Sequence, residues 1–590
     1  MSIQNQEIGF DPDALRLKYK AERDKRVRSD GNDQYQEVEG DFAYFVDDPY
    51  IDKTLQRGPV EDQIEVAIIG GGFGGMLAAA RLREAGIDDF RVIEKGGDFG
   101  GTWYWNRYPG ASCDIESYVY FPLLEKTQFA PQQKYTNAAE TLNYCRVIAE
   151  KYDLHANALM QTKVTCTEWD EDSRRWLVKT DRGDAIKARF VVHSNGPLNR
   201  PKLPAISGIT SFKGHTFHTS RWDYGYTGGN SDGGLDKLKN KRVAVIGTGA
   251  TAVQCVPHLG ASAAELYVFQ RTPSSIDLRN NQPTDPDWLA SQKPGWHEAR
   301  RRNFESLMAG VPVKQDLVND GWTEAFRLLF GTVRDKAPSK LRMACWALLA
   351  VGSRDFYRKG AKKYLTEKAM RHMQFDREME LADFRKMESI RARVDRLVDD
   401  SDTAEALKPY YRQFCKRPCF HDEYLQTFNR PNVTLVDTGG RGVNEINTKG
   451  IVLDGKTYEV DCIIFATGFE VGTDYSRRAG YQIHGIGGQS ISQKWADGIA
   501  TFHGMHVKNF PNAFFFGPIQ SAFTATYTYA LDEQSIHLAH ILKTVRVRGA
   551  TRIEASEAAE QKWVQTIIEK ARKTESFQEQ CTPGYYNNEG

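Results

Sequence analysis

Two glycine-rich turns constrain the fold of this chain more than any other feature. The first spans residues 70–75 and follows the apolar run at residues 64–69; the second spans residues 247–252 and follows the apolar run at residues 242–246. A short apolar run that ends in glycine is typical of a buried parallel strand, and helical spacing follows each turn. Strands that alternate with helices predict an α/β fold.

The first turn has the pattern expected of a phosphate-binding loop. Gly70, Gly72 and Gly75 form G-x-G-x-x-G, which lets the backbone turn tightly and approach a pyrophosphate at the helix N-terminus. The next apolar run, residues 90–93, ends at Glu94, whose carboxylate can accept hydrogen bonds from ribose hydroxyls. This unit predicts a site for FAD or NAD. The alternative is a glycine-rich turn beside a solvated Glu94.

The second unit has the same pattern, but a positive side chain stands where the first unit has a carboxylate. Arg271 follows Gly247 by 24 residues (271 − 247), just as Glu94 follows Gly70 by 24 (94 − 70). A carboxylate would repel a 2′-phosphate, whereas an arginine fork can bind it, so the second site is predicted to take NADP. The alternative is a surface arginine. The predicted cofactor-binding residues of this unit are Gly247, Thr248, Gly249, Ala250, Thr251, Ala252, Gln270 and Arg271.

The remaining stretches of the chain differ in composition and divide it into five parts. The fold class is α/β, with two Rossmann-like dinucleotide-binding domains (FAD and NADP), a mostly helical insertion and an N-terminal extension. The expected boundaries are an N-terminal extension at 1–60, a first part of the FAD domain at 61–198, an NADP domain at 199–437 with the insertion at about 285–410, a second part of the FAD domain at 438–548, and a C-terminal helix and tail at 549–590. The apolar run at 462–465 and its glycine turn are assigned to the second part of the FAD domain. The extension is interpreted as an ordinary surface segment, with a helix from Pro12 to about Ser29.

Composition argues against several classes of function. The net charge is +1, without the basic excess of a nucleic-acid or anionic-membrane binder. The start of the chain lacks an apolar signal core, and the longest apolar run, near 344–351, is shorter than the roughly 20 residues that cross a bilayer. A cytoplasmic protein without membrane insertion is expected.

The nine cysteines are scattered, odd in number and without a Cys-x-x-Cys pair. A disulfide framework is therefore not expected, and a reducing compartment fits better. Cys415 and Cys419 lie near His421, but no second ligand pair stands at zinc-like spacing, so no metal is predicted. Flavin disulfide reductases are disfavoured for the same lack of a redox cysteine pair.

Two longer motifs resemble those of type I Baeyer–Villiger monooxygenases. Residues 212–223 match F-x-G-x-x-x-H-x-x-x-W-D through Phe212, Gly214, His218, Trp222 and Asp223. Residues 100–114 match the second pattern, G-G-x-W-x4-Y-P-G-x3-D. The resemblance covers roughly residues 60–545, and it suggests a conformational role for the first motif rather than a catalytic role for His218.

The resemblance implies a flavoenzyme that uses FAD, NADPH and O2 to convert a ketone to an ester or lactone through a C4a-peroxyflavin. By the same resemblance Arg417 is the active-site cation, Asp114 orients it and Lys416 helps to hold the NADP phosphate. A fixed guanidinium suits an anionic adduct because it stays charged and donates several hydrogen bonds. The implied flavin and nicotinamide contacts are Glu94, Thr102, Trp103, Ser112, Cys113, Asp114, Tyr120 and, more weakly, Val164.

Three alternatives stay open. A flavin oxygenase acting on nitrogen or sulfur has the same fold, although Trp222 and Asp223 argue against it. An uncoupled NADPH oxidase and a nucleotide sensor without turnover are more distant.

The long extension and the segment 416–422 resemble the subgroup that acts on large-ring or polycyclic ketones. The physiological ketone and the oligomeric state are not predicted, and a monomer is compatible with the sequence.

Overall fold

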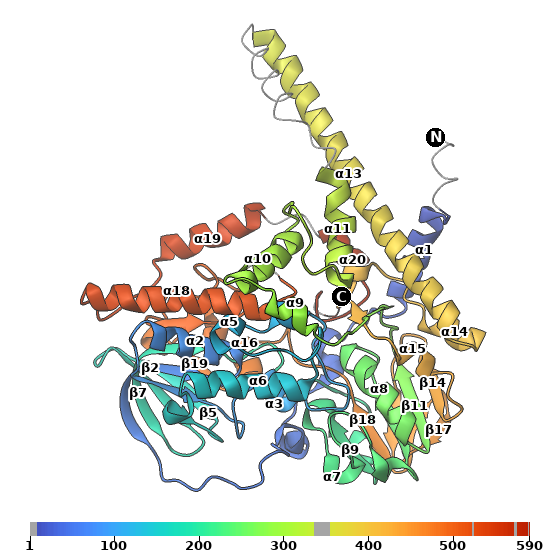
Figure 1. Ribbon diagram of the computed structural model, residues 1–590, viewed down its shortest axis with the longest axis horizontal. Helices are drawn as coiled ribbons and strands as arrows, with labels where there is room; N and C mark the ends of the chain where they lie inside the picture. The colour runs from blue at the N-terminus through green and yellow to red at the C-terminus, as the bar shows by residue number, and fades with distance from the viewer. Residues whose placement is uncertain (1–8, 335–353, 522–523, 571–574, 588, 590) are drawn as a thin grey trace.

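The computed structural model describes residues 9–334, 354–521, 524–570, 575–587 and 589. The apolar run near 344–351 lies outside these residues. Two β-sheets stand side by side, with helices around them and one long helix projecting from the body (Figure 1).

The first sheet contains the first glycine turn. Its strand order is β19-β5-β6-β7-β2-β3-β4, with β20 also paired to β7. The central strands β7, β2 and β3 are parallel, and their apolar residues are almost fully buried, as expected for a sheet covered on both faces. The strands are β2 (Glu61–Ile69), β3 (Phe90–Ile93), β4 (Ala158–Leu159), β5 (Val164–Asp170), β6 (Arg175–Thr180), β7 (Ala185–His193), β19 (Gln482–His484) and β20 (Ala513–Phe515). Helices α2 (Phe73–Glu84) and α18 (Tyr527–Val547) pack together beside it.

The second sheet contains the second glycine turn and has the order β14-β11-β10-β18-β9, with every pairing parallel. Its strands are β9 (His215–His218), β10 (Arg242–Ile246), β11 (Glu265–Gln270), β14 (Val433–Asp437) and β18 (Cys462–Phe465), and α8 (Ala250–Ser262) follows β10. The assignment of residues 462–465 to the FAD part was wrong. β18 pairs with β10, because an apolar strand carries no local mark of the sheet that it joins.

The stretch predicted to be a helical insertion is helical where it is described. It contains α9 (Pro286–Ala290), α10 (Trp296–Met308), α11 (Gly321–Arg334), α13 (Arg354–Leu397) and α14 (Ser401–Leu407). The upper part of α13 projects beyond the body in Figure 1, while its C-terminal part packs on the core through Met387 and Ile390. Among the described residues, no helix has both the length and the apolar character needed to cross a membrane.

The N-terminal extension is more than a surface segment. Helix α1 (Pro12–Asp24) begins at the N-cap Asp11 and buries Tyr19, whose hydroxyl accepts a hydrogen bond from Arg391 Nη1 at 3.0 Å. Farther on, β1 (Tyr35–Gln36) pairs with β8 (Leu203–Pro204) beside the second sheet.

The C-terminal segment returns to the body. After α19 (Glu557–Lys570) and α20 (Glu575–Gln580), Cys581 forms a disulfide with Cys415, 166 residues earlier. The expectation that the cysteines are unpaired fails for this pair, because spacing in sequence does not reveal a contact over such a separation. The same bond removes Cys415 from the metal site that was considered.

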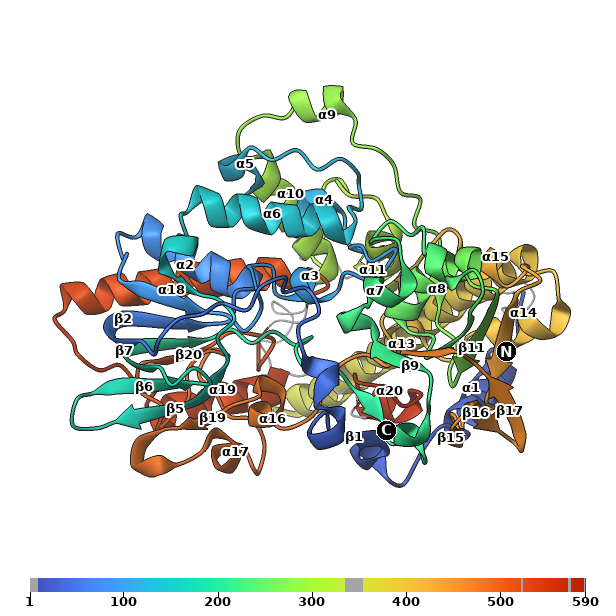
Figure 2. The same ribbon diagram turned by 90° about the horizontal axis from the view of Figure 1, so that it is seen from below.

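The other elements are short connections around these two sheets. The helices are α3 (Thr102–Trp105), α4 (Ser117–Tyr120), α5 (Leu124–Thr127), α6 (Ala138–Lys151), α7 (Tyr224–Thr227), α15 (Tyr424–Thr427), α16 (Tyr475–Ala479) and α17 (Ile491–Lys494), and the strands are β12 (Ile276–Asp277), β13 (Cys419–Phe420), β15 (Glu445–Asn447), β16 (Gly450–Leu453) and β17 (Lys456–Glu459). Figure 2 shows α3 between the two sheets.

Candidate active site

The first glycine turn has the geometry of a dinucleotide loop. Gly70 has a φ of +107°, which favours glycine, and a Cβ on Gly75 would lie 1.9 Å from the carbonyl oxygen of Gly70. Gly72 caps the N-terminus of α2, where backbone N–H groups and the helix dipole favour a phosphate. These residues fit the pyrophosphate of FAD.

Glu94 lies at the end of β3, beside this turn. Its carboxylate is 5% exposed and accepts hydrogen bonds from the backbone N–H of Gly71 at 2.6 Å and of Gly96 at 2.7 Å. These bonds fix the carboxylate next to the phosphate loop, as binding of a ribose requires. The backbone N–H of Thr162 donates to the carbonyl oxygen of Glu94 at 2.9 Å, which brings the predicted adenine contact Val164 into the same region.

The segment 100–114 connects the first turn to the second unit. The N–H of Gly100 donates to the carbonyl oxygen of Gly71 at 3.0 Å, so the segment starts on the first turn. It ends against α8 of the second unit, where Gln254 Nε2 donates to the carbonyl oxygen of Ser112 at 2.9 Å. Asp114, two residues farther on, therefore lies between the two dinucleotide units.

The predicted flavin contacts in this segment lie together. Thr102 opens α3, and the indole Nε1 of Trp103 donates to the hydroxyl of Tyr120 at 3.0 Å. The ring of Tyr120 meets that of Phe73, at the start of α2, edge to face at 5.8 Å. The thiol of Cys113 is buried, which raises its pKa and keeps it protonated, so it is not a nucleophile.

The second glycine turn matches the first in conformation. Gly247 has a φ of +115°, and Gly249 caps α8. A Cβ on Gly249 would meet no atom within 4 Å, so the backbone there faces open space that a pyrophosphate can occupy. Thr248 donates to the carbonyl oxygen of Thr272 at 2.7 Å, and Gln270 is buried and donates to the carbonyl oxygen of Ala406 at 2.8 Å. A cofactor contact by Gln270 stays a prediction.

Arg271 and Lys416 lie beside the second turn, but both contact the ends of the chain. Arg271 Nη1 donates to Gln34 Oε1 at 2.5 Å, and its Nη2 lies 3.4 Å from Glu589 Oε2. Lys416 Nζ donates to the carbonyl oxygen of Pro583 at 2.9 Å. Burial and the charge of Arg271 lower the pKa of Lys416 to about 8. The structure thus brings together the two predicted phosphate ligands, along with contacts from both termini that the sequence did not suggest.

Arg417 and Asp114 form a bidentate ion pair. Arg417 Nε lies 2.8 Å from Asp114 Oδ2, and Nη2 lies 2.7 Å from Oδ1. Burial alone would lower the pKa of Arg417, but the carboxylate of Asp114 outweighs burial and raises it well above its usual value. The guanidinium is a permanent cation, held in one orientation by a planar fork.

Two further residues, which the sequence analysis missed, hold this pair. The indole Nε1 of Trp322 donates to the backbone carbonyl oxygen of Asp114 at 3.1 Å, and the guanidinium of Arg417 lies 5.2 Å from the centroid of its ring. Arg279 Nη2 donates to Ser112 Oγ at 2.7 Å and to the carbonyl oxygen of Cys113 at 2.6 Å. Both come from the chain after the second unit, and no local motif marks them.

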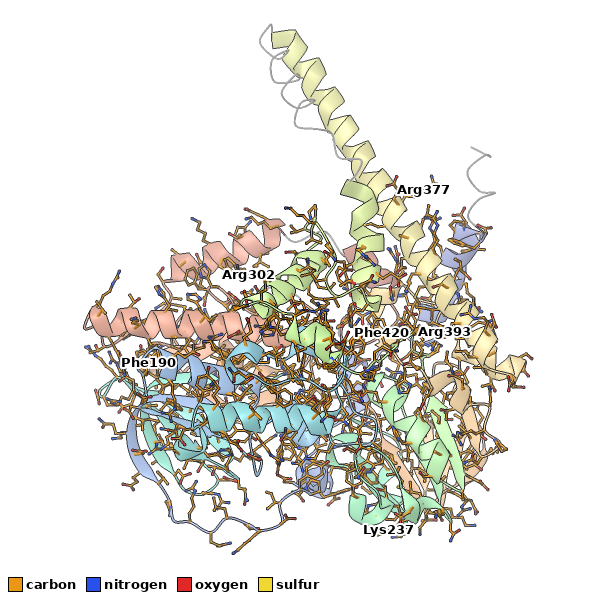
Figure 3. All side chains as sticks on the ribbon, viewed as in Figure 1. Phe190, Lys237, Arg302, Arg377, Arg393 and Phe420 are labelled. Carbon is orange, nitrogen blue, oxygen red and sulfur yellow. A yellow bond between two sulfur atoms is a disulfide. The ribbon has the colours of Figure 1, made fainter. Side chains whose placement is uncertain are left out.

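Trp322 in turn packs against Phe420, with ring centroids 5.6 Å apart. Figure 3 labels Phe420 below α11, near the middle of the molecule. The helical insertion therefore reaches the ion pair directly.

The residues of the 212–223 motif bond to one another and to their neighbours, and their conformational role stays a prediction. Trp222 is 1% exposed and donates to Thr227 Oγ1 at 3.1 Å, while Asp223 Oδ2 lies 2.9 Å from His215 Nε2. His218 is fully buried, and burial lowers its pKa to about 3. Burial therefore keeps the imidazole neutral near neutral pH and makes it a weak base, and the expectation that His218 is not catalytic stays a prediction.

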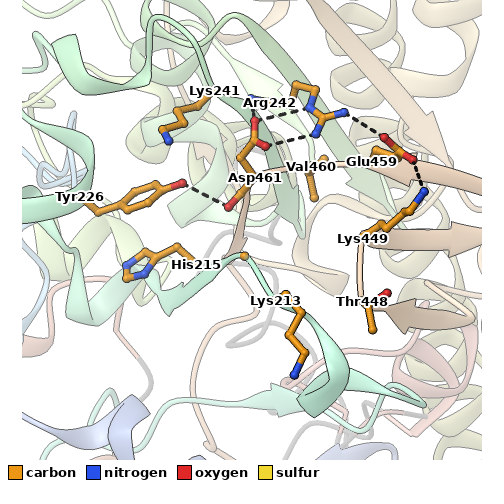
Figure 4. Close-up of a pocket in the computed structure, with 11 residues that line it drawn as sticks. Lys213, His215, Tyr226, Lys241, Arg242, Thr448, Lys449, Glu459, Val460 and Asp461 are labelled. Carbon is orange, nitrogen blue, oxygen red and sulfur yellow. Dashed lines mark hydrogen bonds and ion pairs between the residues drawn. The ribbon is translucent and has the colours of Figure 1, made fainter.

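A surface hollow adjoins this motif but does not fit a cofactor. It is lined by His215, Tyr226, Arg242, Lys449 and Asp461 among others, and Figure 4 shows Arg242 already paired with Asp461. His215 and Arg242 begin β9 and β10, so the hollow lies at the amino ends of the parallel strands. Nucleotides bind at the carboxyl ends, where the two glycine turns lie.

Comparison with known proteins agrees with this geometry. A family model described as pyridine nucleotide-disulphide oxidoreductase matches residues 67–290. The chain is 52% identical over 583 residues to neopentalenolactone D synthase of Streptomyces avermitilis, covering 98% of this chain and 93% of that protein. It is 46% identical to the Baeyer-Villiger monooxygenase ATR8 of Stachybotrys chlorohalonatus, covering 99% of this chain and 89% of that protein.

Solved structures of related enzymes share the fold of this chain. The polycyclic ketone monooxygenase of the fungus Thermothelomyces thermophila superposes with a TM-score of 0.85 at 38% identity, covering 98% of this chain and 92% of that one. An oxidized steroid monooxygenase bound to NADP follows with a TM-score of 0.67 at 30% identity, covering 86% of this chain and 91% of that one. Identity of this degree along nearly the whole length shows that the chain belongs to the family of flavin- and NADP-dependent Baeyer–Villiger monooxygenases.

Proposed function

We propose that this enzyme converts a bulky cyclic ketone to a lactone or ester, with FAD at the first glycine turn and NADPH at the second. The relatives support the substrate class, since the matched structure is named for polycyclic ketones. The observation that carries the proposal is the Arg417–Asp114 ion pair, at the end of the segment that joins the two dinucleotide units.

When bound, NADPH supplies hydride and the flavin supplies the chemistry of oxygen transfer. The part assigned to this chain is electrostatic. Arg417 presents a permanent cation to the negative charge that develops as the ketone carbonyl is attacked, a kind of stabilisation worth ~3–4 kcal/mol per donor. Asp114 holds the guanidinium in place, and Trp322 covers its face.

The environment of the pair favours this role. Trp322 is 4% exposed and the thiol of Cys113 next to Asp114 is buried, so these two side chains shield one side of the pair, while the side chains of Arg417 and Asp114 are themselves 31% and 20% exposed. Charge interactions are stronger in such a site than in water, and a group fixed before the reaction needs no reorganisation during it. Arg279 anchors the backbone that carries Asp114 and thereby limits its movement.

The experiment is NADPH consumption by the FAD-loaded protein with small-ring, large-ring and polycyclic ketones and with sulfides, combined with analysis of the products. The proposal expects ketone-dependent consumption and a product that gains one oxygen atom as a lactone or ester, fastest with polycyclic ketones. Sulfoxide formation without lactone would assign the enzyme to heteroatom oxidation. Hydrogen peroxide as the only product would make it an uncoupled oxidase.

The cytoplasm remains the proposed location. Dioxygen and a small-molecule ketone are the proposed partners, and the oligomeric state forms no part of the proposal.

A further inference from the structure

The C-terminal segment occupies the cations that are proposed to bind the 2′-phosphate of NADPH. The carboxylate of Glu589 is 5% exposed, with Oε1 at 2.8 Å from Lys202 Nζ and Oε2 at 3.4 Å from Arg271 Nη2. Pro583, six residues earlier, accepts the hydrogen bond from Lys416 Nζ. Arg271 and Lys416 thus contact Glu589 and Pro583, respectively.

The environment of Glu589 is that of a bound anion. Burial raises the pKa of its carboxyl, but the charges of Lys202, Arg271 and Lys416 outweigh burial and hold the pKa below its usual value. A buried carboxylate is stable only when paired in this way. A 2′-phosphate needs the same cations, so the carboxylate and the phosphate compete for one site.

The same segment is covalently attached beside the active-site arginine. Cys581 forms its disulfide with Cys415, two residues before Arg417, and the two sulfurs lie in a small core with Met387, Ile390 and Tyr411. Glu589 follows Cys581 by eight positions (589 − 581), and the N–H of Glu589 donates to the carbonyl oxygen of Gly584 at 2.9 Å, so only a short span of chain links the disulfide to the carboxylate. Such a short tether keeps the effective concentration of the carboxylate at the cations high.

We propose that the carboxylate of Glu589 is an intramolecular competitor of NADPH, and that the Cys415–Cys581 disulfide is a redox-modification site that retains this competitor at the 2′-phosphate cations. With the disulfide closed, Glu589 occupies Arg271 and Lys202, and NADPH must displace it. With the disulfide open, the tail can leave, and NADPH binds more tightly. The inference rests on the proposed role of Arg271.

The chemistry of opening is thiol–disulfide exchange with a dithiol. One thiolate of the dithiol attacks a sulfur of the bond and forms a mixed disulfide, and its second thiol resolves it. The dithiol is oxidised to a disulfide and loses two electrons and two protons, and Cys415 and Cys581 each gain one electron and one proton and become free thiols. Reverse exchange with a low-molecular-weight disulfide closes the bond.

The test uses FAD-loaded full-length protein, either oxidised with glutathione disulfide or reduced with dithiothreitol. Peptide mass spectrometry without reduction first checks the bond, and a linked pair that contains Cys415 and Cys581 is expected only in the oxidised sample. Calorimetry then gives the Kd of NADP+ and of NAD+. If the tail occupies the site in about nine molecules of ten, opening the bond tightens NADP+ about tenfold. NAD+, which lacks the phosphate, should change less than about twofold by the same argument.

Two variants distinguish the effect of the disulfide on NADP+ binding from the effect of the Glu589 carboxylate. Cys581→Ser removes the bond without a reductant, and Glu589→Gln removes the charge while keeping the shape; each should tighten NADP+ about tenfold in the oxidised sample. Cys166→Ser is the matched control, because Cys166 is a free cysteine in the first sheet. Circular dichroism of each variant verifies folding.

Three results would overturn the inference: no linked peptide in the oxidised protein, an NADP+ Kd within twofold of wild type in both variants, or weaker NADP+ binding, which would make the tail a clamp on the cofactor. A different result would contradict the proposed role of Arg271. In that case Arg271→Ala leaves the preference for NADP+ over NAD+ unchanged, whatever the tail does.

Discussion

At the residue scale, the proposed chemistry depends on one oriented cation, Arg417. We expect Arg417→Ala to keep FAD and to bind NADP+, because the glycine turns that hold both cofactors are intact, yet to lose about 10²–10³-fold in lactone formation, as when one oxyanion donor is removed. Product analysis beside NADPH consumption checks this, with Arg441→Ala, an exposed arginine paired with Asp454, as the control. Lactone formed by Arg417→Ala at the wild-type rate would remove Arg417 from the mechanism.

Arg271 is proposed to determine the choice of nicotinamide cofactor at the same scale. Replacing it by alanine removes the fork that is proposed to hold the 2′-phosphate, so kcat/KM for NADPH should fall by about 10–100-fold, the range of a charge-assisted hydrogen bond worth ~1.5–3 kcal/mol. The value for NADH should change little. Steady-state kinetics with both cofactors measure this, and an unchanged ratio would place the phosphate elsewhere.

At the scale of elements, α18 connects the first dinucleotide unit to the helical insertion through one buried carboxylate. Asp532 Oδ1 accepts from Arg81 of α2 at 2.7 Å, and Oδ2 accepts from Arg301 of α10 at 3.0 Å. Asp532→Ala leaves Arg301, which is 3% exposed, without its carboxylate, while Arg81 keeps its ion pair with Glu84 at 2.8 Å; the loss should lower the free energy of unfolding by ~3–5 kcal/mol. Urea unfolding of the FAD-loaded protein tests this against Glu533→Ala, an exposed neighbour on the same helix. A loss of stability below about 1 kcal/mol, the free energy typical of an exposed ion pair, would show that Arg301 finds another partner.

The elements also show where sequence reasoning succeeds. Both strand–turn–helix units were predictable, because the glycines, the apolar strand and the charge at its end lie within 24 residues of one another. The strands that pair with β18 could not be predicted, since a buried apolar strand fits either sheet. The same holds for Trp322 and Arg279, which reach the 112–114 segment only through the tertiary fold.

At the scale of the whole molecule, the cluster proposed to bind the 2′-phosphate is assembled from four distant parts of the chain. Gln34 comes from the extension, Lys202 from the link between the sheets, Arg271 from the second unit and Glu589 from the tail. An extension interpreted as a surface segment thus shapes the site, as does a tail held by a disulfide across 166 residues. Contacts between residues so far apart in the chain leave no periodicity or motif in the sequence.

Because so many charges meet there, the site should respond to pH. The charged groups around Lys416 are Arg271, Glu589, Arg26 and Lys202, and burial together with the neighbouring cations brings the pKa of Lys416 down to about 8. Below that pH its ammonium is charged and attracts the phosphate; as pH rises through about 8 it loses the proton, and the attraction disappears. We therefore expect kcat/KM for NADPH to fall about tenfold on the alkaline side, a loss of ~1.4 kcal/mol, while the value for NADH stays level.

The variant Lys416→Arg decides whether Lys416 is responsible. A guanidinium keeps its charge throughout this range, so the decline with NADPH should move beyond pH 10. The profile should be recorded in the oxidised and in the reduced protein, because Glu589 raises the pKa of Lys416 only while the tail is in place. Release of the tail should then shift the decline to lower pH. A decline that stays near pH 8 in Lys416→Arg, or appears equally with NADH, would assign it to another group.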